Sequence, residues 1–105
     1  MAQFDVYDNP NAESRRFVPY LVDVQSALIS QLTTRLVMPL SRVGAQQPKL
    51  PTNLCPVFDI GGESLLLMPH LAAPVPERLL RKPVGSLSHR AAEFTGAFDA
   101  VLSGF

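Results

Sequence analysis

The sequence is short of the residues that build redox and metal sites, and it has no excess of charge of either sign. Its one cysteine and two histidines (Cys55, His70 and His89) make no metal-ligand spacing. A lone cysteine cannot form the disulfide framework of a small secreted domain, so it favours a reducing cytosol. Nine basic residues balance nine acidic ones, which disfavours direct binding to nucleic acid or to an anionic membrane.

Targeting and membrane-spanning segments are not expected either. The start, "MAQFDVYDNP", has neither a basic region nor an apolar stretch, which argues against a signal peptide. The longest apolar run, around residues 65–68, is far too short to cross a bilayer. We therefore expect a soluble, cytoplasmic protein.

Catalytic chemistry finds little support in the sequence. No motif places a base beside Cys55, which is expected to be a small buried residue rather than a nucleophile. Asp59 and Glu63 should lie on two sides of a hairpin turn, where carboxylates are usually solvated. The glycine pair in "IGGES" lacks the lysine and the spacing of a phosphate-binding loop. We predict no catalytic residue, no cofactor and no metal, and hence a non-catalytic binding protein.

Proline, by contrast, is abundant: the ten prolines favour short strands, turns and sheet edges over long helices. At 105 residues and 47% apolar content, the chain has the size and the core of a single domain, residues 1–105. Gly61 and Gly62 can supply the positive φ of a tight turn, which predicts a hairpin over residues 55–68. Alternation predicts strands over residues 3–7, 20–25 and 35–40, the last ending near Pro39. Residues 71–76 and 82–87 are shorter and limited by proline, so they should be edge strands or irregular segments. Residues 26–34 are ambiguous and residues 41–51 should be an exposed loop.

Only the C-terminus predicts a convincing helix, with Ser88 as its N-cap. An apolar stripe at helical spacing should be buried on the sheet; it consists of Leu87, Ala91, Phe94, Phe98, Val101 and Phe105. The opposite side is small and polar, and therefore flat. Strands followed by one helix indicate a small antiparallel barrel or sheet capped by that helix.

Several segments together resemble the CcdB family of bacterial toxins. They are "QFDVY", "ESRR", "LVDVQSALI", "RLVMPL", "CPVFDIGGES", "APVP" and "LSHR", followed by a final glycine and a bulky apolar residue. The resemblance implies a mainly β fold, an SH3-like antiparallel β-barrel with one C-terminal α-helix, assembled as a symmetric homodimer. It also implies that the protein is not an enzyme. Members bind the A subunit of DNA gyrase and are neutralised by a cognate CcdA-like antitoxin.

Matched by position, the resemblance also implies a gyrase-binding surface. It would consist of Leu28, Ile29, Asp99, Leu102, Ser103, Gly104 and Phe105. The best-known family pattern ends in Trp-Gly-Ile, whereas this chain ends in Ser103-Gly104-Phe105. The glycine is kept and the tryptophan, a typical interface anchor, is replaced by serine. No antitoxin-binding residue is predicted.

Four further expectations stay open at this point. Phe105 could belong to the core or the dimer seam rather than to the target surface, and Met38 and Leu40 could contribute apolar area to a dimer. An endoribonuclease toxin on the same fold would need a basic groove, for which Arg15, Arg16 and Arg35 are the candidates. A third possible function is that of a homologue that keeps antitoxin binding but has lost the gyrase target.

Overall fold

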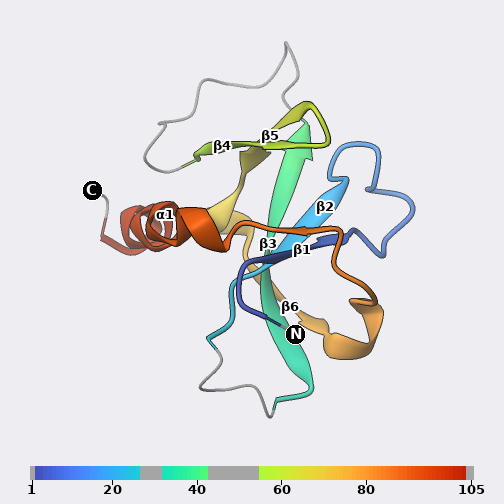
Figure 1. The fold of residues 1–105 in the computed structure, drawn as a ribbon. Coiled ribbons are helices and arrows are strands. Elements are labelled where there is room, and N and C mark those ends of the chain that lie inside the picture. Colours follow the sequence, from blue (N-terminus) through green and yellow to red (C-terminus); the bar gives the residue numbers. More distant parts are fainter. Residues whose placement is uncertain (1, 27–31, 43–54, 104–105) are drawn as a thin grey trace.

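The structure is a computed structural model that describes residues 2–26, 32–42 and 55–103 (Figure 1). Its elements are β1 (Asp5–Asp8), β2 (Tyr20–Asp23), β3 (Thr34–Arg42), β4 (Val57–Ile60), β5 (Glu63–Leu67), β6 (Ala73–Pro76), β7 (Gly85–Ser86) and α1 (Ala91–Ser103). Three 3-10 turns interrupt the second half: η2 (Pro69–Leu71), η3 (Glu77–Leu79) and η4 (Ser88–Arg90).

The strands of this described part form one curled antiparallel sheet in the order β4-β5-β3-β2-β1-β7, and β6 pairs with the other end of β3. Strand β3 is the centre, because β2 lies along one of its edges while β6 and then β5 share the other edge. A mainly β fold with one C-terminal helix was predicted, and the structure confirms it. The curled sheet is consistent with the SH3-like barrel.

The sheet buries side chains on both of its faces. The main core lies under α1 and consists of Val6, Val22, Met38, Leu40, Phe58, Leu65, Leu67, Leu87, Phe94 and Ala97. A smaller second core on the opposite face consists of Tyr7, Leu21, Val37 and Leu80. Since successive side chains of a strand point to opposite faces, neighbours such as Val6 and Tyr7 belong to different cores. Alternation puts Val22 on one face of β2 and Met38 and Leu40 on one face of β3, and all three residues lie in the main core.

The predicted hairpin is present as β4 and β5, which pair from Val57 opposite Leu66 to Ile60 opposite Glu63. Gly61 and Gly62 connect them with φ of 59° and 82°. Positive φ at both central residues is the geometry of a type I′ turn, whose twist matches that of the strands it joins. Glycine adopts this conformation without strain at both positions, as the sequence indicated.

The expectation that the central strand ends near Pro39 is wrong. Strand β3 continues through Pro39 to Arg42, so Ser41 and Arg42 belong to the strand and not to a loop. Pro39 is tolerated because β6 pairs only as far as Val37 and β5 begins at Leu40. Proline has no N–H to donate, and Pro39 lies at the point where the partner of β3 changes from β6 to β5. Its carbonyl accepts a hydrogen bond from the Met68 N–H at 3.0 Å.

The helix begins later than predicted. Ser88 is not its N-cap, because Ser88–Arg90 forms the 3-10 turn η4 and α1 starts at Ala91. Arg90 stabilises this end of the helix instead. Its side chain pairs with Glu93, and its guanidinium carbon lies 4.0 Å from the centre of the Phe58 ring. The start of α1 is thereby attached to the hairpin.

The apolar stripe of α1 is shorter than predicted. Phe94 is 2% exposed and Ala97 is fully buried, but Phe98 is only partly buried and Val101 is exposed. The expectation of a buried Phe98 and Val101 is therefore wrong. Figure 1 shows the reason, since the C-terminal half of α1 extends away from the strands. No helix in the described residues is long and apolar enough to cross a membrane.

Candidate functional site

The end of α1 presents an exposed surface of mixed chemistry. Leu102 is 72% exposed and Val101 is 36% exposed, and both follow the point at which the helix leaves the core. Asp99 and Ser103 are also exposed and lie one turn apart. The Ser103 hydroxyl donates a hydrogen bond to the Asp99 carbonyl oxygen at 2.6 Å. Leu102 and Val101 are adjacent in the chain, so the end of α1 combines exposed apolar side chains with the carboxylate of Asp99.

A groove of about 170 Å³ runs between α1 and the sheet, next to this surface. It is lined by Gln3, Phe4, Val24, Leu36, Met38, Phe94, Thr95, Phe98 and Asp99. Asp99 therefore lies at the junction of the helix end and the end of β2, where Val24 continues the chain. Phe98, which was expected in the core, forms part of the groove wall.

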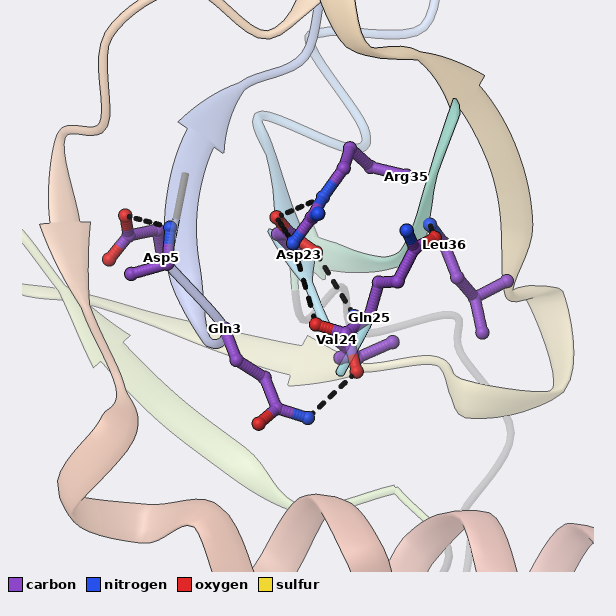
Figure 2. Close-up of polar contacts among 8 residues, drawn as sticks. Gln3, Asp5, Asp23, Val24, Gln25, Arg35 and Leu36 are labelled. Carbon is purple, nitrogen blue, oxygen red and sulfur yellow. Dashed lines mark hydrogen bonds and ion pairs between the residues drawn. The ribbon is translucent and has the colours of Figure 1, made fainter. Parts of the chain in front are cut away.

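A buried polar network fixes the end of β2 (Figure 2). Asp23 is fully buried and forms an ion pair with Arg35, which is 2% exposed, at 2.8 Å. Asp23 also accepts a hydrogen bond from the Gln25 N–H at 3.0 Å. The Gln25 side chain in turn accepts from the Leu36 N–H at 3.0 Å.

The network ties residues 23–25 to residues 35–36, on either side of the segment that carries Leu28 and Ile29. Gln3 extends it, because its side-chain amide donates to the Val24 carbonyl at 3.1 Å. Sequence reasoning did not single out Asp23 or Arg35 as partners. The only available signal was the "VDVQS" motif itself, in which a charged residue follows buried apolar positions.

The residues predicted to bind gyrase are only partly placed by the structure. Asp99, Leu102 and Ser103 lie together on the last turns of α1, exposed to solvent. Leu28, Ile29, Gly104 and Phe105 lie outside the described residues, as does most of the ambiguous segment 26–34 and of the predicted loop 41–51.

The candidates for a nuclease groove do not come together. Arg35 is buried in its ion pair with Asp23, so its assignment to a basic groove is wrong. Arg16 lies over the Phe17 ring, 5.2 Å from its centre, on the exposed loop before β2. The two carboxylates of the hairpin have separate partners: Asp59 accepts from the Ser64 hydroxyl at 2.8 Å, and Glu63 pairs with Arg42 at 2.7 Å. They do not form an acid–base pair.

The apolar area suggested for a dimer is also misplaced. Met38 and Leu40 are 2% and 0% exposed within one chain, because both point into the main core under α1. They cannot cover a second copy.

Cys55 is buried, as predicted, and its burial raises the pKa of the thiol. The nucleophilic thiolate is therefore scarcer than in an unfolded chain at the same pH. We expect iodoacetamide at about pH 8 to alkylate the native protein at least roughly tenfold more slowly than the protein unfolded in guanidinium. Mass spectrometry of quenched samples measures both rates, and equal rates would show that the thiol is accessible.

Among the described residues, no three His, Cys, Asp or Glu side chains are grouped as metal ligands.

These features define a small β protein whose candidate site is an exposed helix end beside a groove, suited to contact with another macromolecule. The family model described as CcdB protein matches residues 3–104, nearly the whole chain. The chain belongs to the CcdB family.

Proposed function

We propose that this protein is the toxin of a toxin–antitoxin system and acts by binding the A subunit of DNA gyrase rather than by catalysis. Membership of the CcdB family supports the class of function. The observation that carries the target is the end of α1: Asp99, Leu102 and Ser103, at positions matched to the family's gyrase contacts, are exposed and near one another. The remaining contacts would come from Leu28, Ile29, Gly104 and Phe105.

The same proposal includes a symmetric homodimer and a cognate CcdA-like antitoxin as partners, both implied by the family. The seam of this dimer would have to lie apart from the end of α1, because a second copy that covered Leu102 would block its contact with gyrase. In a two-fold pair the same surface serves both chains, so two helix ends can face one target.

Ser103 is the weak point of the proposed gyrase surface, and it provides the test. Its hydroxyl is small and donates back to its own helix, to the Asp99 carbonyl. Replacing Ser103 with tryptophan should therefore strengthen binding to the gyrase A subunit by about 2 kcal/mol, or roughly thirtyfold, as a restored interface anchor does. Titration of purified gyrase A subunit measures the change.

The matched control is Ala92→Trp, which adds the same side chain at an exposed position near the other end of α1. It should leave gyrase affinity unchanged, and Leu102→Asp should abolish binding. If the wild type and Ser103→Trp both fail to bind, the gyrase target is wrong. A homologue that keeps only the antitoxin interaction then becomes the better description.

A further inference from the structure

A second and larger cavity, of about 570 Å³, lies beside the end of β1 and is separate from the helix surface. Its lining comes from three parts of the chain: Asp8, Asn9 and Pro10; Arg15; and Arg78, Leu79, Arg81 and Lys82. Figure 1 shows the segment after η3 running back toward β1, where Val84 N–H donates to the Val6 carbonyl at 2.8 Å. Residues far apart in sequence thus meet around one hollow.

The basic residues that form no ion pair are concentrated at this cavity. In the described part of the chain, Arg35, Arg42 and Arg90 form ion pairs, and Arg16 lies over an aromatic ring. The remaining arginines and lysine of that part all line the cavity: Arg15, Arg78, Arg81 and Lys82. Only one carboxylate, Asp8, lies among them. Of the five described basic residues that form no ion pair, four therefore lie around one hollow, and Arg16 is the fifth.

The walls of the cavity are held in place by buried contacts. The Asn9 side chain is 5% exposed and donates to the Ser14 hydroxyl at 2.9 Å and to the Val18 carbonyl at 2.8 Å. Arg15 Nε donates to the Asn9 carbonyl at 2.8 Å, which fixes the base of this guanidinium. Leu80 is buried in the second core between Arg78 and Arg81, and anchors the opposite wall. A preformed hollow loses less entropy on binding than a flexible surface.

We propose that this cavity binds a compact ligand that carries two or more phosphate groups, of the size of a nucleoside diphosphate. Arginine forks suit phosphate oxygens because each can donate two parallel hydrogen bonds, and three of the four cations are arginines. The volume falls within the range of small-molecule sites, roughly 300–1,000 Å³. Asp8 would accept hydrogen bonds from the hydroxyl groups of a sugar. A ligand made only of anionic groups has no such donor. Pro10 and Leu79 add apolar wall.

The test is isothermal titration of the full-length protein with four probes: orthophosphate, pyrophosphate, ADP and adenosine. We expect pyrophosphate and ADP to bind, both more weakly as salt is raised, and adenosine not to bind. ADP binding more tightly than pyrophosphate supports a nucleotide, whereas equal affinities support the phosphate groups alone as the ligand. Orthophosphate should bind more weakly than either because it offers fewer oxygens.

Two variants locate the site. Arg78→Ala/Arg81→Ala should weaken binding of pyrophosphate and ADP at least about tenfold, since each lost charged hydrogen bond commonly accounts for that much. Arg16→Ala, which removes an exposed cation outside the cavity, is the matched control and should change the affinity less than about twofold. Thermal melting of both variants should match the wild type, because Arg78 and Arg81 are exposed.

Three results would overturn the proposal. One is the absence of binding by pyrophosphate and ADP. Another is equal affinity of wild type and double variant. The third is tighter binding of a glutamate-rich peptide or of an RNA oligonucleotide than of ADP, which would assign the cavity to an acidic protein segment or to nucleic acid. None of these outcomes depends on gyrase, so this test and that of the toxin function can fail separately.

Discussion

Replacing Phe94 with alanine should lower the free energy of unfolding by about 3–5 kcal/mol, the usual range for a phenylalanine removed from a packed core. Phe94 stands between two other aromatic rings, with its centroid 4.9 Å from that of Phe4 and 5.0 Å from that of Phe58. Its ring therefore joins α1 to the entry of β1 and to the hairpin. A domain of this size is typically stable by about 5–15 kcal/mol, so the loss is a large share of the total.

Phe98→Ala is the matched control, because it removes the same side chain one turn later on the same helix. Phe98 is only partly buried and lines the groove beside α1, so the expected loss is roughly 1–2 kcal/mol. Urea unfolding followed by circular dichroism measures both losses. Equal losses in the two variants would contradict the burial described for Phe98.

The sequence predicted those elements of the fold that are determined by neighbouring residues. The hairpin followed from two adjacent glycines, whose positive φ no other residue adopts as easily. The strand faces followed from alternation in β2 and β3. Each of these features depends on residues within one short window, and each is present in the structure.

The wrong predictions depend on partners far away in the sequence. Pro39 lies inside β3 because β6 pairs with the residues before it and β5 pairs with the residues after it, along one edge of that strand. No local pattern in the sequence reveals this change of partner. Phe98 and Val101 follow helical spacing, but the sheet beneath α1 ends before them. The second core was missed for the same reason, since Leu80 packs on Tyr7 from more than seventy positions away.

The segments that carried the family resemblance are mainly structural. In "VDVQS", Val22 is a core residue, Asp23 pairs with Arg35, and Gln25 accepts the Leu36 N–H. In "LSHR", Leu87 is buried and Arg90 attaches α1 to Phe58. These motifs therefore predict the fold well. Of the residues proposed to bind gyrase, those at the end of the described helix (Asp99, Leu102 and Ser103) lie outside these two motifs, and there Ser103 stands where the family pattern has tryptophan.

The basic cavity could not be predicted at all. Arg15 and Arg81 are separated by most of the sheet in sequence, and each is unremarkable in its own window. Only the return of the chain from η3 to β1 brings them to one hollow. A net charge of zero disfavours binding of the chain as a whole to nucleic acid or to an anionic membrane, but it leaves a local concentration of positive charge possible.

The second large effect is expected at the buried ion pair. Arg35→Met should lower the free energy of unfolding by about 3–5 kcal/mol, because it leaves the Asp23 carboxylate without its partner and without water. Glu63→Gln is the matched control, because it weakens an exposed ion pair made by Arg42, another arginine of β3. The side chains of Arg42 and Glu63 are 43% and 42% exposed, so the free energy of unfolding should fall by less than about 1 kcal/mol.

A double variant, Asp23→Leu/Arg35→Met, separates the cost of an unpaired charge from the value of the pair itself. With both charges removed and the volume kept, much of the stability lost in Arg35→Met should return, as apolar replacements of buried pairs commonly show. Asp23 also accepts the Gln25 N–H, so the double variant should still loosen the segment at Gln25, whose side chain accepts the Leu36 N–H. We therefore expect amide hydrogen exchange to increase at Gln25 and Leu36 while the global unfolding energy recovers. A double variant no more stable than Arg35→Met would show that the pair is needed for packing and not only for charge balance.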